Sequence, residues 1–416
     1  ILQEPGYFES FQTLNPAPIQ KIGLQHVNLK AESDKIRAAK RPAQSPTVPK
    51  PIPDLDTDGL VFAHLHNHTQ YSILQSTAEV GALIQKAVAL GQPAVALTDT
   101  GNMMAAFQFE KMAAAHNAKI KAARAEAEEN GEAFDGQEIL PIIGCEFNVC
   151  RNHQDKSVKD NGYQIVCLAK NKSGYQNLIK LASIAYTQGM YYVPRIDKEV
   201  LSKYKEDLII LSGNLYGEIP SLLLNVGERQ AEEALLWWKA QFGADFYIEM
   251  GRHGLEVEER LNPLLQDLAQ KHAVKLIATN NTYYVEQKDA VAHDVLLCVK
   301  DNELVETPKG RGRGFRYGLE NDSYYMRSTE EMLALFSDIP EAIANISEII
   351  DKCEPYGLAR EVLLPAFDIP EEFQDPLDAE DGGKRGENAF LKHLTYKGAK
   401  ERYKEITDEI KERIDF

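Results

Sequence analysis

Between residues 59 and 300, short apolar segments alternate with longer amphipathic ones, and this alternation constrains the possible folds most strongly. The apolar segments have the length of β-strands: GLVFAHLH, PAVALTD, LPIIGCEFNV, YQIVCLAK, DLIILSG, DFYIEM and KLIATN. The first connecting segment places apolar residues at helical spacing: Val80, Leu83, Ile84, Ala87 and Val88. Seven units of this kind favour a parallel αβ barrel, in which functional side chains gather at the carboxyl ends of the strands.

The segments on either side of this region differ in character. Residues 1–58 show little hydrophobic periodicity and close with the Pro-rich stretch RPAQSPTVPKPIPDLDTD, which predicts an extension and a linker. After residue 300 come PKGRGRGFRYG and STEEMLALF, where Ser328 and Glu331 predict a capping box at a helix start. We therefore expect three parts: 1–58, a barrel over 59–300, and a second region over 301–416. The chain begins with Ile, and we expect it to be a piece of a longer protein.

The formal net charge of −17 argues against a surface that binds nucleic acid throughout, because phosphate binding requires clustered Lys and Arg. KGRGRGFRYG is the local exception. It carries four basic and two aromatic residues suited to phosphate contact and base stacking: Lys309, Arg311, Arg313, Arg316, Phe315 and Tyr317. An exposed surface loop has much the same composition, and both interpretations stay open.

Cysteine usage indicates a reducing compartment. The five cysteines form no CxxC pair, and no apolar run is long enough for a membrane span, so we expect a cytoplasmic protein without a membrane segment. The sequence also lacks GxxxxGK[ST], GxSxG and HExxH motifs. Their absence argues against three classes of enzyme activity: nucleotide hydrolysis by a P-loop, serine hydrolysis and common metalloprotease chemistry.

The segment HLHNHT places three histidines in five positions at the end of the first predicted strand. Side chains alternate along a strand, so His64, His66 and His68 could converge on one ion. A catalytic metal site needs further ligands and an open position, and a polar strand end with hydrogen-bonded histidines has the same local pattern. From these residues alone, both alternatives remain.

Six motifs follow one another along the chain: HLHNHTQYS, ALTDTGNM, GCEFNV, LSGNLYGEIP, YIEMGRHG and ATNNTYYVEQKDAVAHDVLLCV. In this order they resemble the polymerase and histidinol phosphatase (PHP) domain, more specifically the form in the alpha subunit of bacterial replicative DNA polymerase III. The segment YYMRSTEEMLALFSDIPEAIAN extends the resemblance into the start of the polymerase palm. The implied fold is of the α/β class: a distorted seven-stranded (β/α) barrel followed by the beginning of an α+β palm region.

The resemblance also implies a set of metal ligands, of which four are retained: His66, His68, Glu146 and His253. The other ligand positions carry different residues: Gln75 and Asn281 where the family has Asp, Thr100, Gln164 and Tyr283 where it has His, and Asn214 where a Cys is common. Amides, hydroxyls and phenols are poor ligands for divalent transition metals. We therefore expect no catalytic residues and no cofactor in this site beyond, at most, one weakly bound divalent ion.

The resemblance implies part of a DNA-directed DNA polymerase, a nucleotidyltransferase of DNA replication. No aspartate-rich palm motif that would hold catalytic Mg²⁺ follows the barrel, so we expect these 416 residues alone to be inactive as a polymerase. The PHP domain would be a structural platform for a proofreading exonuclease and other replicase subunits, with primed DNA bound by the full-length protein. The alternatives are an active metal-dependent phosphoesterase or 3′–5′ proofreading exonuclease, and a free-standing binding module.

Overall fold

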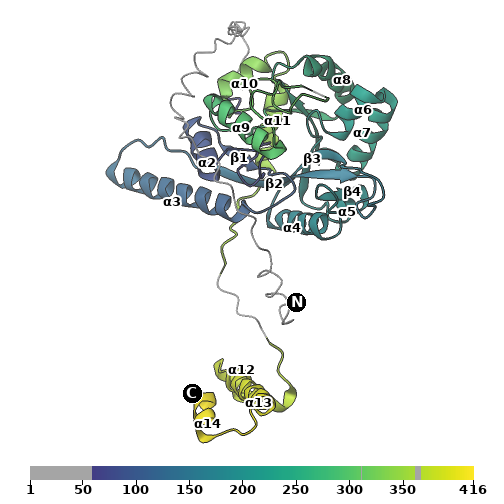
Figure 1. Cartoon of the computed structure of the whole chain (residues 1–416). Helices are drawn as coiled ribbons and strands as arrows, with labels where there is room; N and C mark the ends of the chain where they lie inside the picture. Colours follow the sequence, from purple (N-terminus) through teal and green to yellow (C-terminus); the bar gives the residue numbers. More distant parts are fainter. Residues whose placement is uncertain (1–58, 311, 361–366) are drawn as a thin grey trace, which may run out of the picture. The chain divides into compact units, whose positions relative to one another are not determined.

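The computed structural model describes residues 59–310, 312–360 and 367–416 (Figure 1). The predicted extension and linker, 1–58, and the basic residue Arg311 lie outside the described residues. The strands are β1 Ala94–Leu97, β2 Leu140–Cys150, β3 Tyr163–Ala169, β4 Arg195–Asp197, β5 Leu208–Leu211, β6 Phe246–Gly251 and β7 Lys275–Thr279. They form one mixed sheet in the order β1-β2-β3-β5-β6-β7, with β4 paired to β2.

The expected first strand, GLVFAHLH, is extended but forms only isolated bridges. His64 pairs with Val95 in β1, and Asn67 pairs with Thr282 just after β7. The segment therefore lies between the two edges of the sheet and joins them, which closes the barrel. β4, a strand of three residues, was not predicted, because so short a segment carries no recognisable periodicity.

The expectation of an all-parallel barrel is wrong at β3. This strand pairs antiparallel with both β2 and β5, whereas the β1–β2, β5–β6 and β6–β7 pairs are parallel. The connection between β2 and β3, residues 151–162, contains no helix, so the chain turns back beside the strand it has just left. The α/β class and the count of seven strands agree with the sequence prediction.

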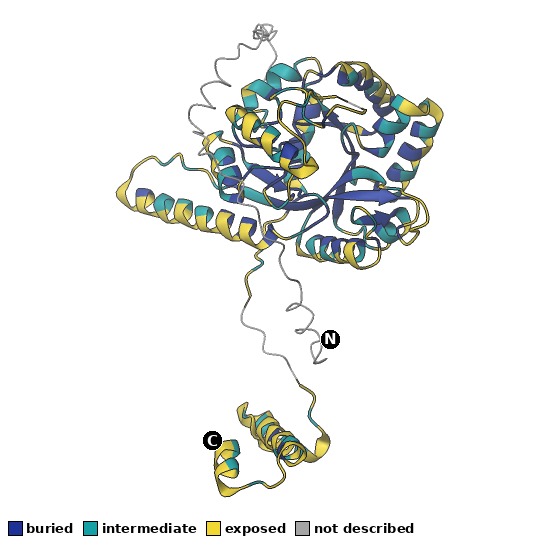
Figure 2. Cartoon of the chain, viewed as in Figure 1, coloured by how far each residue is buried: buried dark blue, intermediate teal, exposed yellow. Residues whose placement is uncertain are grey.

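Helices cover the sheet, and Figure 2 shows buried residues concentrated in the strands and on the inner sides of these helices. The helices up to residue 301 are α2 Val80–Ala89, α3 Ala106–Asn130, α4 Lys172–Thr187, α5 Lys198–Lys203, α6 Glu218–Asn225, α7 Glu228–Phe242, α8 Glu256–His272 and α9 Ala290–Asp301. The predicted apolar face of α2 is confirmed, since Val80, Leu83, Ile84 and Ala87 are buried. Among the described residues, no helix is both long and apolar enough to cross a membrane.

Residues after 301 first form α10 Thr329–Leu335 and α11 Glu341–Asp351. The predicted capping box is confirmed, because Ser328 and Glu331 bond to each other's backbone N–H groups at the start of α10. Ile343 and Ile346 of α11 belong to the same buried cluster as the barrel strands. The Asn345 side chain donates a hydrogen bond of 2.8 Å to the carbonyl of Leu276 in β7. These two helices therefore share the barrel's core.

The last described segment, 367–416, forms α12 Pro376–Asp381, α13 Arg385–Arg402 and α14 Asp408–Asp415. Phe390 of α13 packs against Phe367 and Phe373, and Tyr396 donates a hydrogen bond to Asp415 in α14. The assignment of residues 301–416 to the start of a palm region stays a prediction.

Candidate functional site

The candidate site lies inside the barrel at the edge where parallel strands end. The extended segment before β1 supplies His66 and His68, and β2 supplies Glu146. Gln164 comes from the beginning of β3, because an antiparallel strand starts at the edge where its parallel neighbours end. The mixed sheet thus brings residues far apart in the chain to one place.

Three of the four predicted metal ligands lie together. Ligand atoms of His66, His68 and Glu146 all lie within 4.8 Å of one another, and all three residues are buried. His66 Nε2 lies 3.2 Å from Glu146 Oε2, and His68 Nε2 lies 3.5 Å from Glu146 Oε1. We refer to these three residues as the His-Glu cluster. Two imidazoles and a carboxylate match the donor atoms that zinc and similar ions accept.

A second carboxylate, Glu249 of β6, lies beside the His-Glu cluster and was not predicted from the sequence. Its Oε1 lies 2.6 Å from His66 Nδ1 and also accepts a 2.6 Å hydrogen bond from Thr279. Burial lowers the pKa of His66, but Glu249 and Glu146 outweigh this effect and raise the pKa from 6.5 to about 10. The one sequence signal was an acidic residue within an apolar strand, DFYIEM, since a buried carboxylate needs a partner.

Two of the residues that replace family ligands bond directly to Glu146. Thr100 Oγ1 donates a 2.9 Å hydrogen bond to Glu146 Oε1, and Gln164 Nε2 donates one of 3.2 Å to the same oxygen. Burial alone would raise the pKa of Glu146, but His68 and His66 hold it well below its usual range. Glu146 is therefore ionised, and one of its oxygens is occupied by neutral donors.

The aromatic ring of Tyr283 covers His68. The two rings are stacked with centroids 4.4 Å apart. Both ring nitrogens of His68 are buried without a hydrogen-bond partner among the described residues. The Asn281 amide Nδ2 approaches the Tyr283 hydroxyl at 3.5 Å, and Gln75 lies at the mouth of the barrel, where it lines a hollow of about 660 Å³. Only part of the polar centre is satisfied by the substituted residues.

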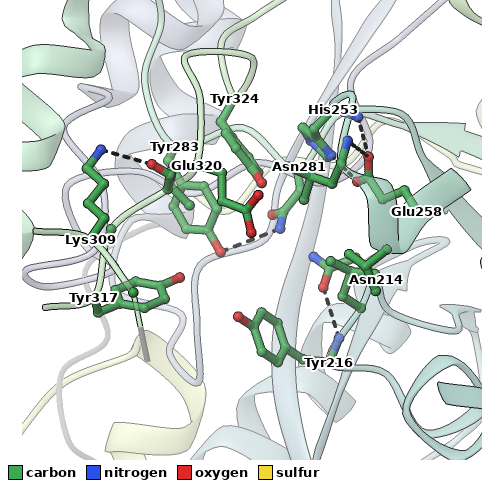
Figure 3. Close-up of a pocket in the computed structure, with 16 residues that line it drawn as sticks. Asn214, Tyr216, His253, Glu258, Asn281, Tyr283, Lys309, Tyr317, Glu320 and Tyr324 are labelled. Atoms are coloured by element: carbon green, nitrogen blue, oxygen red, sulfur yellow. Dashed lines mark hydrogen bonds and ion pairs between the residues drawn. The ribbon is translucent and has the colours of Figure 1, made fainter. Parts of the chain in front are cut away.

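His253, the fourth predicted ligand, lies outside the His-Glu cluster. Its Nδ1 lies 2.6 Å from Glu258 Oε1, its Nε2 lies 3.3 Å from the carbonyl of Asn280, and its ring stacks on Tyr324. Asn214 likewise faces a neighbouring cavity of about 630 Å³ (Figure 3). Its side chain accepts a hydrogen bond from the Tyr216 backbone. Both ring nitrogens of His253 are occupied, so it is not free to join the cluster.

The basic loop after residue 308 is held by an ion-pair network. Arg316 is buried and donates two hydrogen bonds, of 2.9 and 2.8 Å, to the carboxylate of Asp294, and Lys309 lies 2.9 Å from the same carboxylate. Arg313, Phe315 and Tyr317 are exposed. Two of the basic residues proposed for phosphate contact therefore have structural partners.

Comparisons with known proteins agree with this geometry. Residues 64–253 match the model of the PHP domain family. The chain is 37% identical over 360 residues to "DNA polymerase III subunit alpha" of Treponema pallidum and 36% identical over 357 residues to that of Borreliella burgdorferi. Each alignment covers 85% of this chain and 28% of the relative. A solved amidohydrolase structure from Chromobacterium violaceum covers 54% of this chain and 88% of its own, at 11% identity and a TM-score of 0.33, too weak a likeness to carry an argument.

The His-Glu cluster and most of the barrel lie within residues 64–253, the part of the chain that matches the PHP domain family. Over 85% of its length the chain is similar to DNA polymerase III alpha subunits, and it spans about 28% of the length of these two relatives.

Proposed function

We propose that this chain is the PHP-containing part of a replicative DNA polymerase III alpha subunit, and that its PHP domain is a structural platform without phosphoesterase activity. The full-length protein would be a cytoplasmic DNA-directed DNA polymerase that binds primed DNA and uses Mg²⁺ at a palm site. A proofreading exonuclease and other replicase subunits would be its partners. The similarity over 85% of the chain to alpha subunits supports the polymerase assignment.

The single observation that carries the inactive-platform proposal is the environment of Glu146. A multinuclear cluster needs bridging carboxylates, but here Thr100 and Gln164 donate to one oxygen of Glu146 where histidine ligands would be required. Asn281 and Gln75 carry no charge, so two negative charges that would offset several cations are missing. His253 is bonded to Glu258. The remaining residues do not fit a two-metal centre.

The same residues fit one divalent ion. Glu249 accepts the Nδ1 proton of His66, and a metal ion that displaced the Nε2 proton would use Nε2 as its ligand atom, an arrangement common among metal-binding histidines. The unpartnered ring of His68 and the carboxylate of Glu146 would complete a site of three ligands. A bound ion would supply a Lewis acid and an activated water. This fit favours the second candidate function, a metal-dependent phosphoesterase or 3′–5′ exonuclease.

Metal content and hydrolysis distinguish the two functions. The chain purified without chelator should contain well under one equivalent of zinc or manganese by elemental analysis, and should hydrolyse neither phosphodiester substrates nor single-stranded DNA ends. His68→Ala is the matched control, because it removes one ligand and leaves both carboxylates, Glu146 and Glu249, in place. Two or more tightly bound ions, together with exonuclease activity that His68→Ala abolishes, would replace the platform proposal with the nuclease function.

A further inference from the structure

Beside the His-Glu cluster lies a cavity of about 630 Å³, bounded by loops that follow β5, β6 and β7 and by residues 309–310, 317–320 and 324. Four tyrosines, two amides and two carboxylates line it: Tyr216, Tyr283, Tyr317, Tyr324, Asn214, Asn281, Glu258 and Glu320 (Figure 3). We call this cavity the tyrosine pocket. Leu215, Val257 and Leu319 add apolar lining.

The two basic side chains that border the tyrosine pocket, Lys309 and His253, already have partners. Lys309 Nζ donates a 2.9 Å hydrogen bond to the carbonyl of Leu319 and lies 2.9 Å from Asp294 Oδ1. His253 is bonded through Nδ1 to Glu258 and through Nε2 to a backbone carbonyl. Both basic side chains are therefore bonded within the protein and offer little to an anionic ligand.

In contrast to these donors, a hydrogen-bond acceptor that lines the pocket lacks a partner. Asn281 is only 5% exposed, and its Oδ1 is buried with no hydrogen-bond partner among the described residues. Glu320 is exposed and lines the same pocket as Asn281 (Figure 3). A buried acceptor without a donor costs free energy, so this pocket favours a ligand that brings N–H donors and positive charge.

We propose that the tyrosine pocket binds an organic cation, an alkylammonium or a guanidinium group. Tyrosine faces attract cations through the ring quadrupole, the carboxylate of Glu320 adds charge complementarity, and the apolar residues accommodate an alkyl chain. The net charge of −17 raises the local concentration of cations around the molecule. The group could belong to a free polyamine or to a Lys or Arg side chain of a bound polypeptide. This inference does not depend on the polymerase assignment.

Isothermal titration calorimetry of the 416-residue chain tests the proposal with spermidine, N-acetyl-arginine amide and tetramethylammonium. Spermidine or the arginine derivative should bind saturably, and added salt should weaken binding. Tetramethylammonium, which has no N–H, should bind about tenfold more weakly because it cannot donate to Asn281. Glu320→Gln and Tyr216→Leu, both at exposed positions, should each weaken binding about tenfold, whereas Glu132→Gln, at an exposed carboxylate remote from the pocket, should not.

The relative affinities of spermidine and the arginine derivative distinguish the two sources of the cation. Tighter binding of spermidine supports a free polyamine, and tighter binding of the arginine derivative supports a polypeptide side chain. The proposal is overturned if no organic cation binds saturably below about 10 mM, or if Glu320→Gln binds as well as the unmodified chain. A third outcome would also overturn the proposal: Mn²⁺ binds saturably, Glu320→Gln removes this binding, and no organic cation binds. The pocket would then be assigned to an inorganic ion.

Discussion

The rings of His68 and Tyr283 lie parallel, with an interplanar angle of 2° and centroids 4.4 Å apart. The resemblance to the PHP family implies a histidine ligand at position 283, whereas the ring of Tyr283 packs against His68, one of the expected ligands. Gln164 and Thr100, which also stand where the resemblance implies histidine ligands, donate hydrogen bonds to Glu146. At these three positions the side chains make packing and hydrogen-bond contacts within the protein.

The histidines of the His-Glu cluster should differ in their contribution to stability. His66→Ala leaves Glu146 and Glu249 buried without the imidazole between them, and we expect a loss of about 3 kcal/mol or more in the free energy of unfolding. His68→Ala removes a stacked ring without a hydrogen-bond partner and should cost about 1–2 kcal/mol. Urea unfolding measures both values, with the less buried His116→Ala as control. Equal midpoints for His66→Ala and the unmodified chain would contradict a buried ionic role.

Restoring the family's ligands should restore metal binding. The combined variant Gln75→Asp, Thr100→His, Gln164→His, Asn281→Asp and Tyr283→His supplies two carboxylates and three imidazoles to an existing frame, so bound zinc or manganese should rise to one equivalent or more. Elemental analysis after gel filtration measures the change. The double variant Gln75→Asn and Gln164→Asn is the control, because it alters the same surface without adding ligands. Unchanged metal content in a folded five-residue variant would show that the backbone no longer positions these side chains.

Acid should destabilise the protein through His64. Its Nε2 lies 3.0 Å from the carbonyl of Arg327, and burial lowers its pKa from 6.5 to about 4. A histidine with a depressed folded-state pKa contributes stability above pH 6.5, and that contribution is lost as the pH falls towards 4, by at most about 3 kcal/mol. Within this window the contribution of His66, whose pKa is raised, stays constant. The slope of unfolding free energy against pH should be smaller in His64→Gln, and identical slopes would disprove the assignment.

The basic loop should contribute to stability more than to DNA affinity. Arg316→Ala removes the buried partner of Asp294 and should lower the free energy of unfolding by about 1–3 kcal/mol. Arg313→Ala, at an exposed position of the same loop, should stay within about 0.5 kcal/mol. Thermal unfolding and fluorescence anisotropy with a primed duplex give the two readouts. A larger loss of DNA affinity for Arg316→Ala than for Arg313→Ala, without loss of stability, would favour the nucleic-acid interpretation.

The 416-residue chain should not extend a primed template. Nucleotidyl transfer needs carboxylates that hold two metal ions, and no such motif follows the barrel in the sequence. A gel-based primer extension assay with Mg²⁺ and all four nucleotides measures this, with a full-length alpha subunit as the positive control. Extension by the purified chain would place the catalytic carboxylates within these residues.

Local pattern was sufficient for much of the fold and part of the site. Apolar strands, the buried face of α2 and the Ser328–Glu331 capping box depend on neighbouring residues, so their periodicity and spacing were visible in the sequence. The His-Glu cluster was accessible through the resemblance to the PHP domain, whose motifs carry His66, His68 and Glu146 in order.

Tertiary structure decided the rest, because it depends on which distant segments become neighbours. The antiparallel direction of β3 follows from how the chain returns after β2, and no residue pattern within the strand records it. Glu249 lies 183 residues from His66, so its role appears only when the barrel closes. His253 matches a ligand motif in the sequence, yet its Nδ1 forms a hydrogen bond with the nearby Glu258. Most buried polar groups bond to a partner within reach, and only the folded chain determines which partners are within reach.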